Sequence, residues 1–411
     1  MKINKFTFSS IFFILFISFG AQSELTNDSH LDFQIRSFSL DRKFINKNAT
    51  IKKQSSYSTG ALWKFTSGYT DTLIAAGFDL DSQYSTRLRS VGNDDTLPFN
   101  KGTNNTSPHY GRIGGDLKLK YHNTIFKIGN MQPNNPILGT EDTRMLPSIA
   151  QGAVIESHDI NGLLLTGGQF WSQITRQSSN KEMFYLSGQS ESRGSDKLTF
   201  MGGEYNLTPQ TKVSGYYAIL KNIYQQNYTS FSHRLILENL PIINLSARYN
   251  QFRNDGDTLG GNIDNRSYGL IAAISGVSQT LAFSYQRMLG ETGYAQLNGG
   301  TPLSYVVNAG ALGFINKDEK SWSARYRYLI HTGVLEGIGV GVRYGRGTNI
   351  YHGDEMARGK ESETDTVLTY NPTEGALKNF GVTLLYALVR QSAGIDANTL
   401  RLQLIYNFNI F

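Results

Sequence analysis

Residues 321–328 read SWSARYRY, and residues 338–345 read IGVGVRYG. In the first stretch Trp322 and Tyr326 share one parity, whereas Arg325 and Arg327 share the other. An alternation with a period of two is typical of a strand with one apolar and one polar face. The pattern recurs in residues 31–36, 112–121, 243–250 and 400–410, and clusters of Gly, Asn, Asp and Pro separate these runs. The sequence therefore predicts many β-strands.

The first 23 residues have the features of a secretory signal peptide. Lys2 and Lys5 precede an apolar run at residues 11–19, and Ala21-Gln22-Ser23 supplies small residues for cleavage. The alternative is an N-terminal membrane anchor, but the apolar run is short for a span. We expect residues 1–23 to be a signal peptide and residues 24–411 to form one domain, because no linker or change in composition interrupts them.

Composition excludes several classes of protein. The chain has 411 residues, a formal net charge of +6, a mean hydropathy of −0.33 and no cysteine. Without cysteine there is no disulfide, thiol nucleophile or thiolate metal site. After residue 23 no apolar run approaches the roughly 18 residues of a membrane helix. The mild positive charge and the secretory signal both argue against a nucleic-acid partner.

Two architectures fit alternating strands: a soluble sandwich or propeller, and a membrane β-barrel. Tyr and Phe recur near the predicted strand ends, as the aromatic girdles of outer-membrane barrels require. Residues 400–410 alternate and resemble the last strand that the barrel assembly machinery recognises, although Phe411 has the opposite parity. At roughly 10 residues per strand, residues 24–411 correspond to about 16–18 strands. We therefore predict an all-β, transmembrane antiparallel β-barrel with an aqueous channel.

Longer motifs carry a family resemblance. They include DTRMLP at 142–147, ESHDI at 156–160, GEY at 203–205, IDNR at 263–266, GETG at 290–293, LNGG at 297–300, DEKSW at 318–322 and RYGRG at 343–347. In this order and spacing, they resemble the OprD family of substrate-selective outer-membrane porins. The resemblance implies an 18-stranded barrel with inward-folded external loops in the outer membrane of a Gram-negative bacterium. It also implies contact with membrane lipid, assembly by the barrel assembly machinery, and a monomer or loose trimer.

Basic residues are the candidate pore-lining, substrate-binding side chains. The resemblance implies a ladder of inward cations that guides carboxylate solutes, and a guanidinium is well suited to bind a carboxylate. The candidates of polar parity are Arg112, Lys118, Lys120, Arg248, Arg325, Arg327 and Arg343, and Arg346 of the RYGRG motif joins them. The alternative is charge pairing along the lumen wall, with Asp116 and Glu204 as partners.

Arg144 belongs to a different part of the predicted pore. Its DTRMLP segment resembles the end of the loop that constricts the channel in this family, so Arg144 is a candidate for solute contact. A salt bridge to Asp142 or Glu141 that holds the loop is the slightly favoured alternative.

One departure from the family bears on selectivity. Thr383 and Leu385 stand where family members commonly place two arginines, and Arg327, which stands where an acidic residue is common, would compensate in part. The first hypothesis is a porin for passive diffusion of small hydrophilic solutes, with carboxylates such as amino acids and small peptides preferred. Oligosaccharides, or general diffusion, are the alternative.

No catalytic, cofactor or metal site is expected. The sequence contains no Gly-x-Ser-x-Gly nucleophile elbow, and its seven histidines are scattered. A non-conducting structural barrel is a further alternative. Calcium could bind at residues 254–257, NDGD, but a plain turn is the favoured interpretation.

Overall fold

The computed structural model describes residues 28–46, 49–91, 96–98, 106–301, 304–354 and 356–409. The predicted signal peptide at residues 1–23 lies outside these ranges. Within them, no helix is long and apolar enough to cross a membrane.

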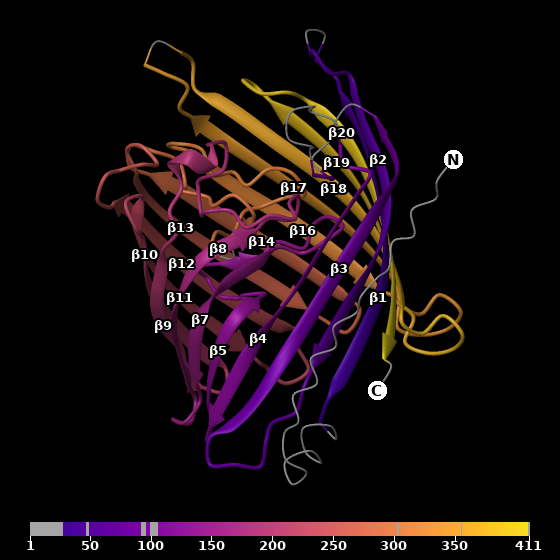
Figure 1. Ribbon diagram of the computed structural model, residues 1–411. Coiled ribbons are helices and arrows are strands. Elements are labelled where there is room, and N and C mark those ends of the chain that lie inside the picture. Colours follow the sequence, from indigo (N-terminus) through magenta and orange to yellow (C-terminus); the bar gives the residue numbers. More distant parts are fainter. Residues whose placement is uncertain are drawn as a thin grey trace, which may run out of the picture.

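The described chain is built almost wholly of strands that follow one another around a barrel (Figure 1). Their bounds are β1 (His30–Phe44), β2 (Lys53–Thr66), β3 (Ala75–Val91), β4 (His109–Tyr121), β5 (Thr124–Met131), β6 (Gly139–Thr140), β7 (Ile149–Ser157), β8 (Leu163–Ile174), β9 (Leu198–Thr208), β10 (Thr211–Leu220), β11 (Tyr224–Leu235), β12 (Ile242–Asn254), β13 (Asp264–Ser275), β14 (Gln279–Leu289), β15 (Gly300–Thr301), β16 (Lys320–Leu329), β17 (Ile338–Ile350), β18 (Gly359–Tyr370), β19 (Phe380–Gln391) and β20 (Ala397–Asn409). A single 3₁₀ turn, Glu191–Arg193, lies between β8 and β9.

Eighteen of these strands form one closed antiparallel sheet. Each strand pairs with the next one along the chain, and β20 returns to pair with β1, so that Phe33 lies opposite Phe408. Closure removes the sheet edges, which would otherwise expose unpaired backbone groups to lipid. The predicted barrel of about 18 strands is confirmed.

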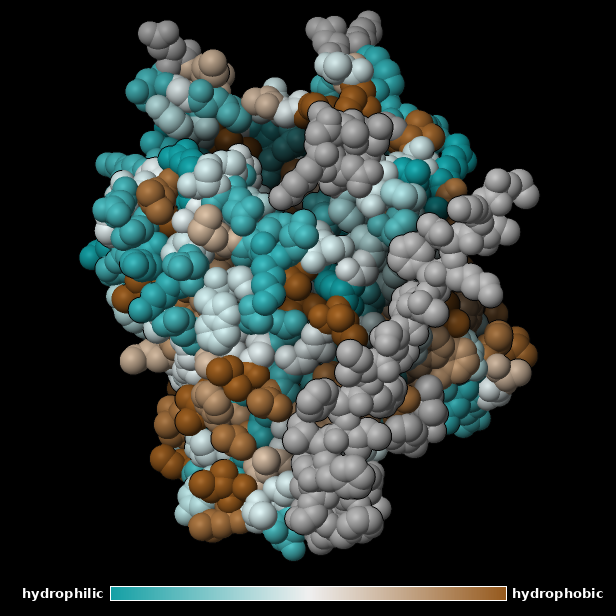
Figure 2. All heavy atoms as spheres, in the orientation of Figure 1, coloured by the Kyte–Doolittle hydropathy of each residue, from teal (hydrophilic) through white to brown (hydrophobic). Residues whose placement is uncertain are grey.

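The two faces of the sheet differ as the alternation predicts. Phe33 stacks on Trp63 and on Phe408, each with ring centroids 5.3 Å apart, on the outer face. The outer face is also rich in exposed large apolar side chains, such as Leu281 and Phe283 on β14. Figure 2 shows hydrophobic residues gathered over the lower part of one side of the molecule, whereas hydrophilic residues dominate its upper part. Such an apolar band is what the hydrocarbon layer requires.

The longest loops join the strands at one end of the barrel, and mostly shorter turns join them at the other. Three of the long loops, 132–148, 175–197 and 290–319, meet one another and the inner wall of β7–β12 in one apolar cluster. Ile137 and Leu138 come from the first loop, Phe184 and Leu186 from the second, and Leu297 from the third. Because outer-membrane barrels carry their longer loops on the extracellular side, this end is external. The expectation of inward-folded external loops is confirmed.

Candidate functional site

The constriction is formed by two loops that pair with each other inside the barrel. β6 of loop 132–148 and β15 of loop 290–319 make a two-stranded antiparallel sheet, in which Gly300 lies opposite Thr140. Loop 175–197 joins them, because Asn298 Nδ2 donates to Tyr185 Oη at 2.6 Å. Loop 175–197 was not predicted from the sequence to join the constriction. A solute in the lumen therefore passes a wall made of three mutually bonded loops.

Arg112 anchors these loops rather than facing open lumen. Its guanidinium donates to the Thr175 carbonyl at 2.9 Å, to the Ser178 carbonyl at 3.2 Å and to the Pro147 carbonyl, and its Nε donates to Gln83 Oε1 at 2.9 Å. Only 8% of the residue is exposed. Arg112 thus ties loops 132–148 and 175–197 to β4.

The two carboxylates proposed to hold Arg144 bind other arginines. Asp142 pairs with Arg36 on β1, which is 3% exposed, and Glu141 pairs with Arg176. Arg144 itself is buried and donates to the Thr143 carbonyl at 2.9 Å. Arg36 alternates with apolar residues in β1, so its inward parity was readable from the sequence.

The lysines of β4 lie at the short-turn end of the lumen. Lys118, 3% exposed, donates to Asp79 Oδ1 at 2.5 Å and to the Ser67 carbonyl at 2.7 Å. Its ammonium also lies 4.9 Å from the centroid of the Tyr69 ring, and that of Lys120 lies 5.5 Å from the same centroid. Lys118 is therefore neutralised in the wall, whereas Lys120 remains exposed.

The remaining inward arginines divide into bound and exposed groups. Arg248 donates to the Tyr305 carbonyl at 3.3 Å and so contacts loop 290–319. Arg343 pairs with Asp365 on the adjacent strand β18. Arg325 lies opposite Arg343, and both Arg325 and Arg327 are exposed on β16. These two are therefore the arginines of the predicted ladder that are most accessible to a solute.

Arg346 does not line the pore. It follows Val342 and Tyr344 on one face of β17, and both of those side chains belong to the lipid-facing row. Its partner in β16 is Trp322, which stacks on Phe283 of the outer face. The interpretation of Arg346 as pore-lining is wrong because the strand continues its alternation through Gly345, so that Arg346 takes the outer parity.

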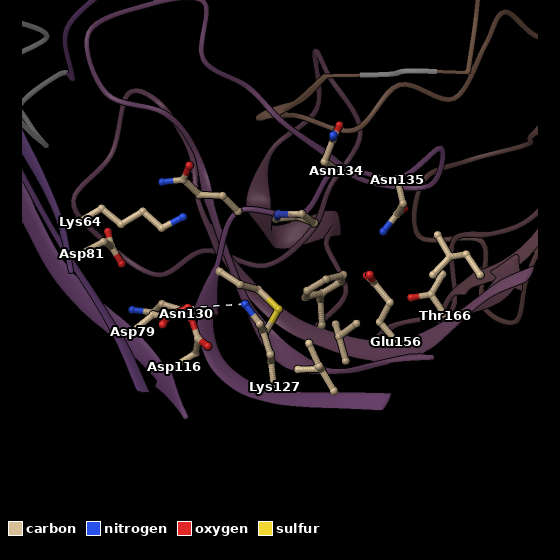
Figure 3. Close-up of a pocket in the computed structure, with 18 of the residues that line it drawn as sticks. Lys64, Asp79, Asp81, Asp116, Lys127, Asn130, Asn134, Asn135, Glu156 and Thr166 are labelled. Carbon is tan, nitrogen blue, oxygen red and sulfur yellow. Dashed lines mark ion pairs between the residues drawn. The ribbon is translucent and has the colours of Figure 1, made fainter. Parts of the chain in front are cut away.

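An acidic chamber of about 440 Å³ lies below loop 132–148. Figure 3 shows Asp79, Asp81 and Asp116 at one side of this chamber and Glu156 at the other, with Asn134 and Asn135 of the loop above them. The chamber is lined by five carboxylates, Asp79, Asp81, Asp116, Glu156 and Glu204, and by two lysines, Lys64 and Lys127. Lys127 Nζ lies 3.5 Å from Asp79 Oδ2, and Lys212 holds Glu204 at 2.6 Å. A solute ammonium can find several carboxylates in this chamber.

The chamber was not predicted as a site, although its residues have inward parity. Asp79 and Asp81 alternate with apolar residues in β3. Only Asp116 and Glu204 were predicted to lie on the lumen wall, as partners for cations. The expected charge pairing is found for Glu204, but its partner, Lys212, was not among the candidates.

The two positions that lack the family arginines face the lumen. Leu385 lies opposite Arg401 of β20, and Thr383 lies opposite Gln403. Arg401, which sequence reasoning missed, alternates with Leu400 and Leu402 and places a guanidinium on the strand beside Leu385.

The described residues contain no cluster of three or more His, Asp or Glu side chains that could hold a metal ion. At the turn where calcium was the alternative, the Asp255 carboxylate accepts from the Asn222 backbone N–H at 2.8 Å and from Gln225 Nε2 at 3.0 Å. Asp255 therefore joins neighbouring turns.

The comparisons with known proteins agree with this geometry. The family model described as "outer membrane porin, OprD family" matches residues 23–410. The porin-like protein GalP of Pseudomonas putida is 27% identical over 84% of each chain. Crystal structures of two Pseudomonas aeruginosa proteins superpose closely on this chain. OpdQ has a TM-score of 0.85 and 30% identity, and the match covers 95% of this chain and 100% of OpdQ. The structure of OpdK with vanillate has a TM-score of 0.88 and 26% identity, and the match covers 94% of this chain and 100% of OpdK. The chain therefore belongs to the OprD family of outer-membrane porins and resides in the outer membrane of a Gram-negative bacterium.

Proposed function

We propose that this porin conducts small zwitterionic carboxylates, such as amino acids and short peptides, by passive diffusion. The observation that carries the proposal is the division of charge in the lumen. One part of the wall bears the acidic chamber with its five carboxylates, and β16 bears the exposed Arg325 and Arg327. A solute with an ammonium and a carboxylate can replace part of its hydration by contacts of the ammonium with the chamber and of the carboxylate with the two arginines.

Several weak contacts along a bore lower the barrier to passage without trapping the solute. The guanidinium groups of Arg325 and Arg327 can bind a carboxylate in a forked geometry. The relative OpdK has been crystallised with vanillate, a carboxylate. Arg401 lies opposite Leu385, one of the two positions that lack a family arginine, and so places a guanidinium next to that position.

The first test is the reversal potential of the purified protein in a planar bilayer under a salt gradient, followed by solute flux into proteoliposomes. We expect amino acids to enter faster than a neutral sugar of equal size, and Arg325→Gln/Arg327→Gln to reduce that ratio several-fold. Lys378→Gln, in the turn between β18 and β19, is the control and should leave the ratio unchanged. Equal fluxes of sugar and amino acid in the unaltered protein would favour the oligosaccharide or general-diffusion alternative. Absence of conductance would exclude a porin.

A further inference from the structure

A row of cations lies on the outer face of the barrel, at the external ends of neighbouring strands. We name it the outer basic belt, and it consists of Arg253 on β12, Arg266 on β13, Arg287 on β14, Lys320 on β16, Arg346 on β17, Lys360 on β18 and Arg390 on β19. The register connects its members: Arg287 lies opposite Lys320, and Ser362 lies between Arg346 and Arg390. None of these cations belongs to the lumen pathway.

The belt lies one step beyond an aromatic girdle. On four successive strands, an outward aromatic residue stands two positions from the outward cation: Tyr268 and Arg266, Tyr285 and Arg287, Trp322 and Lys320, Tyr344 and Arg346. Aromatic girdles mark the level at which hydrocarbon gives way to lipid headgroups. Two residues of a strand span about 7 Å, so the cations lie at the height of the headgroups.

The charges of the belt are not neutralised by the protein. None of the seven forms an ion pair with a described residue. Five of them are exposed, and Arg287 and Arg390 are partly buried. Following the register from Arg253 onto β11, β10, β9 and β8 reaches only neutral residues, namely Gln225, Ile219, Thr199 and Gln169. The belt therefore ends at β12 in this direction.

The belt contains a groove of about 320 Å³ with three of its cations, Arg346, Lys360 and Arg390. Ser362 stands between the two arginines on the same face. Two carboxylates also line the groove. Glu361 has the inward parity of β18 and accepts from Gln391 Nε2 at 3.0 Å, and Asp396 accepts from the Gln391 backbone N–H at 2.8 Å. Two guanidinium groups, an ammonium and a hydroxyl match the oxygens of a phosphate.

We propose that the outer basic belt binds the phosphate groups of an anionic glycolipid in the outer leaflet of the membrane, with the groove around Ser362 as its main site. The position of the cations on the lipid face, beyond the girdle, favours a lipid over a soluble solute. Basic residues at a membrane surface contribute additively to the binding of anionic lipid.

The experiment measures binding of the full barrel in detergent to phosphorylated lipid A, to the same glycolipid without phosphates, and to inorganic phosphate. The test variant is Arg346→Gln/Arg390→Gln. The matched control is Arg234→Gln/Lys378→Gln, which removes the same charge near the short-turn end of the barrel, where both residues are exposed. Reversal potentials of both variants verify that the barrel is folded and conducting.

We expect phosphorylated lipid A to bind the unaltered protein and the control equally, and the test variant at least about tenfold more weakly. Affinity should fall as salt rises, because the contact is electrostatic. Equal affinity of the test variant and the control overturns the proposal, and so does equal binding of the dephosphorylated glycolipid. Inorganic phosphate binding as tightly as the lipid would assign the groove to a soluble anion and overturn the choice of a lipid.

Discussion

Replacing Arg112 with glutamine tests whether this arginine anchors loops or attracts solutes. The guanidinium contacts the carbonyls of Thr175, Ser178 and Pro147 and is 8% exposed. Hydrogen bonds from a charged donor contribute ~1.5–3 kcal/mol each, but burial of the guanidinium offsets part of that sum. Removing the guanidinium leaves buried carbonyl acceptors without a donor, at a cost of about 1–3 kcal/mol each.

We therefore expect Arg112→Gln to weaken the closed arrangement of loops 132–148 and 175–197 by about 3 kcal/mol or more, the summed cost of the three unpaired carbonyls. Since about 1.4 kcal/mol corresponds to a factor of ten, the fraction of time that these loops spend displaced should rise at least about a hundredfold. The Arg36–Asp142 ion pair and the packing of Met145 and Leu146 still hold loop 132–148, so the barrel should remain intact.

Single-channel recording distinguishes the two roles of Arg112. The structure predicts frequent transitions between conductance levels and little change in reversal potential. Arg325→Gln, at an exposed lumen position, is the control and should shift the reversal potential without new transitions. A quiet Arg112→Gln channel with a shifted reversal potential would refute the anchoring role and restore Arg112 to the ladder.

Three further outcomes are expected. Asp79→Asn should leave the buried Lys118 ammonium without its carboxylate and lower the free energy of unfolding by about 3–5 kcal/mol. Asp81→Asn should lower the free energy of unfolding by less. Thermal unfolding in detergent measures both. Gly299→Ala should release loop 290–319 and add noise to the single-channel current, because Gly299 has φ +77° and a Cβ there would lie 2.6 Å from Thr175 Cγ2. Gly188→Ala is the control for backbone strain alone, because Gly188 has φ +83° but a Cβ there would have no atom within 4 Å. Burial and the neighbouring Glu361 carboxylate raise the pKa of Glu319, at the end of loop 290–319, to about 8. The folded state therefore holds this proton more tightly than the unfolded chain and loses stability as pH rises from about 4.5 to about 8. Glu319→Gln should flatten this pH dependence, and an unchanged slope of melting temperature against pH would contradict the prediction.

Strand alternation predicted the barrel because a membrane barrel needs only local regularity. Each outward residue meets lipid and each inward residue meets water or a loop, so parity alone assigned Arg325 and Arg327 to the lumen and Trp322 to the lipid face. The same alternation, extended from Val342 and Tyr344 to Arg346, would have placed Arg346 on the outer face of the barrel. The outer basic belt follows from the same rule once the register shows which strands are neighbours.

Periodicity and family motifs were enough to predict the fold, the inward parity of most candidate residues and the presence of constricting loops. Which inward charges a solute can reach depends instead on tertiary contacts. Arg112 and Lys118 have the same parity class as Arg325, yet loop carbonyls bind the first and Asp79 binds the second. These partners lie more than thirty residues away in the chain, so their distance depends on how the loops fold back into the barrel, which no local pattern encodes.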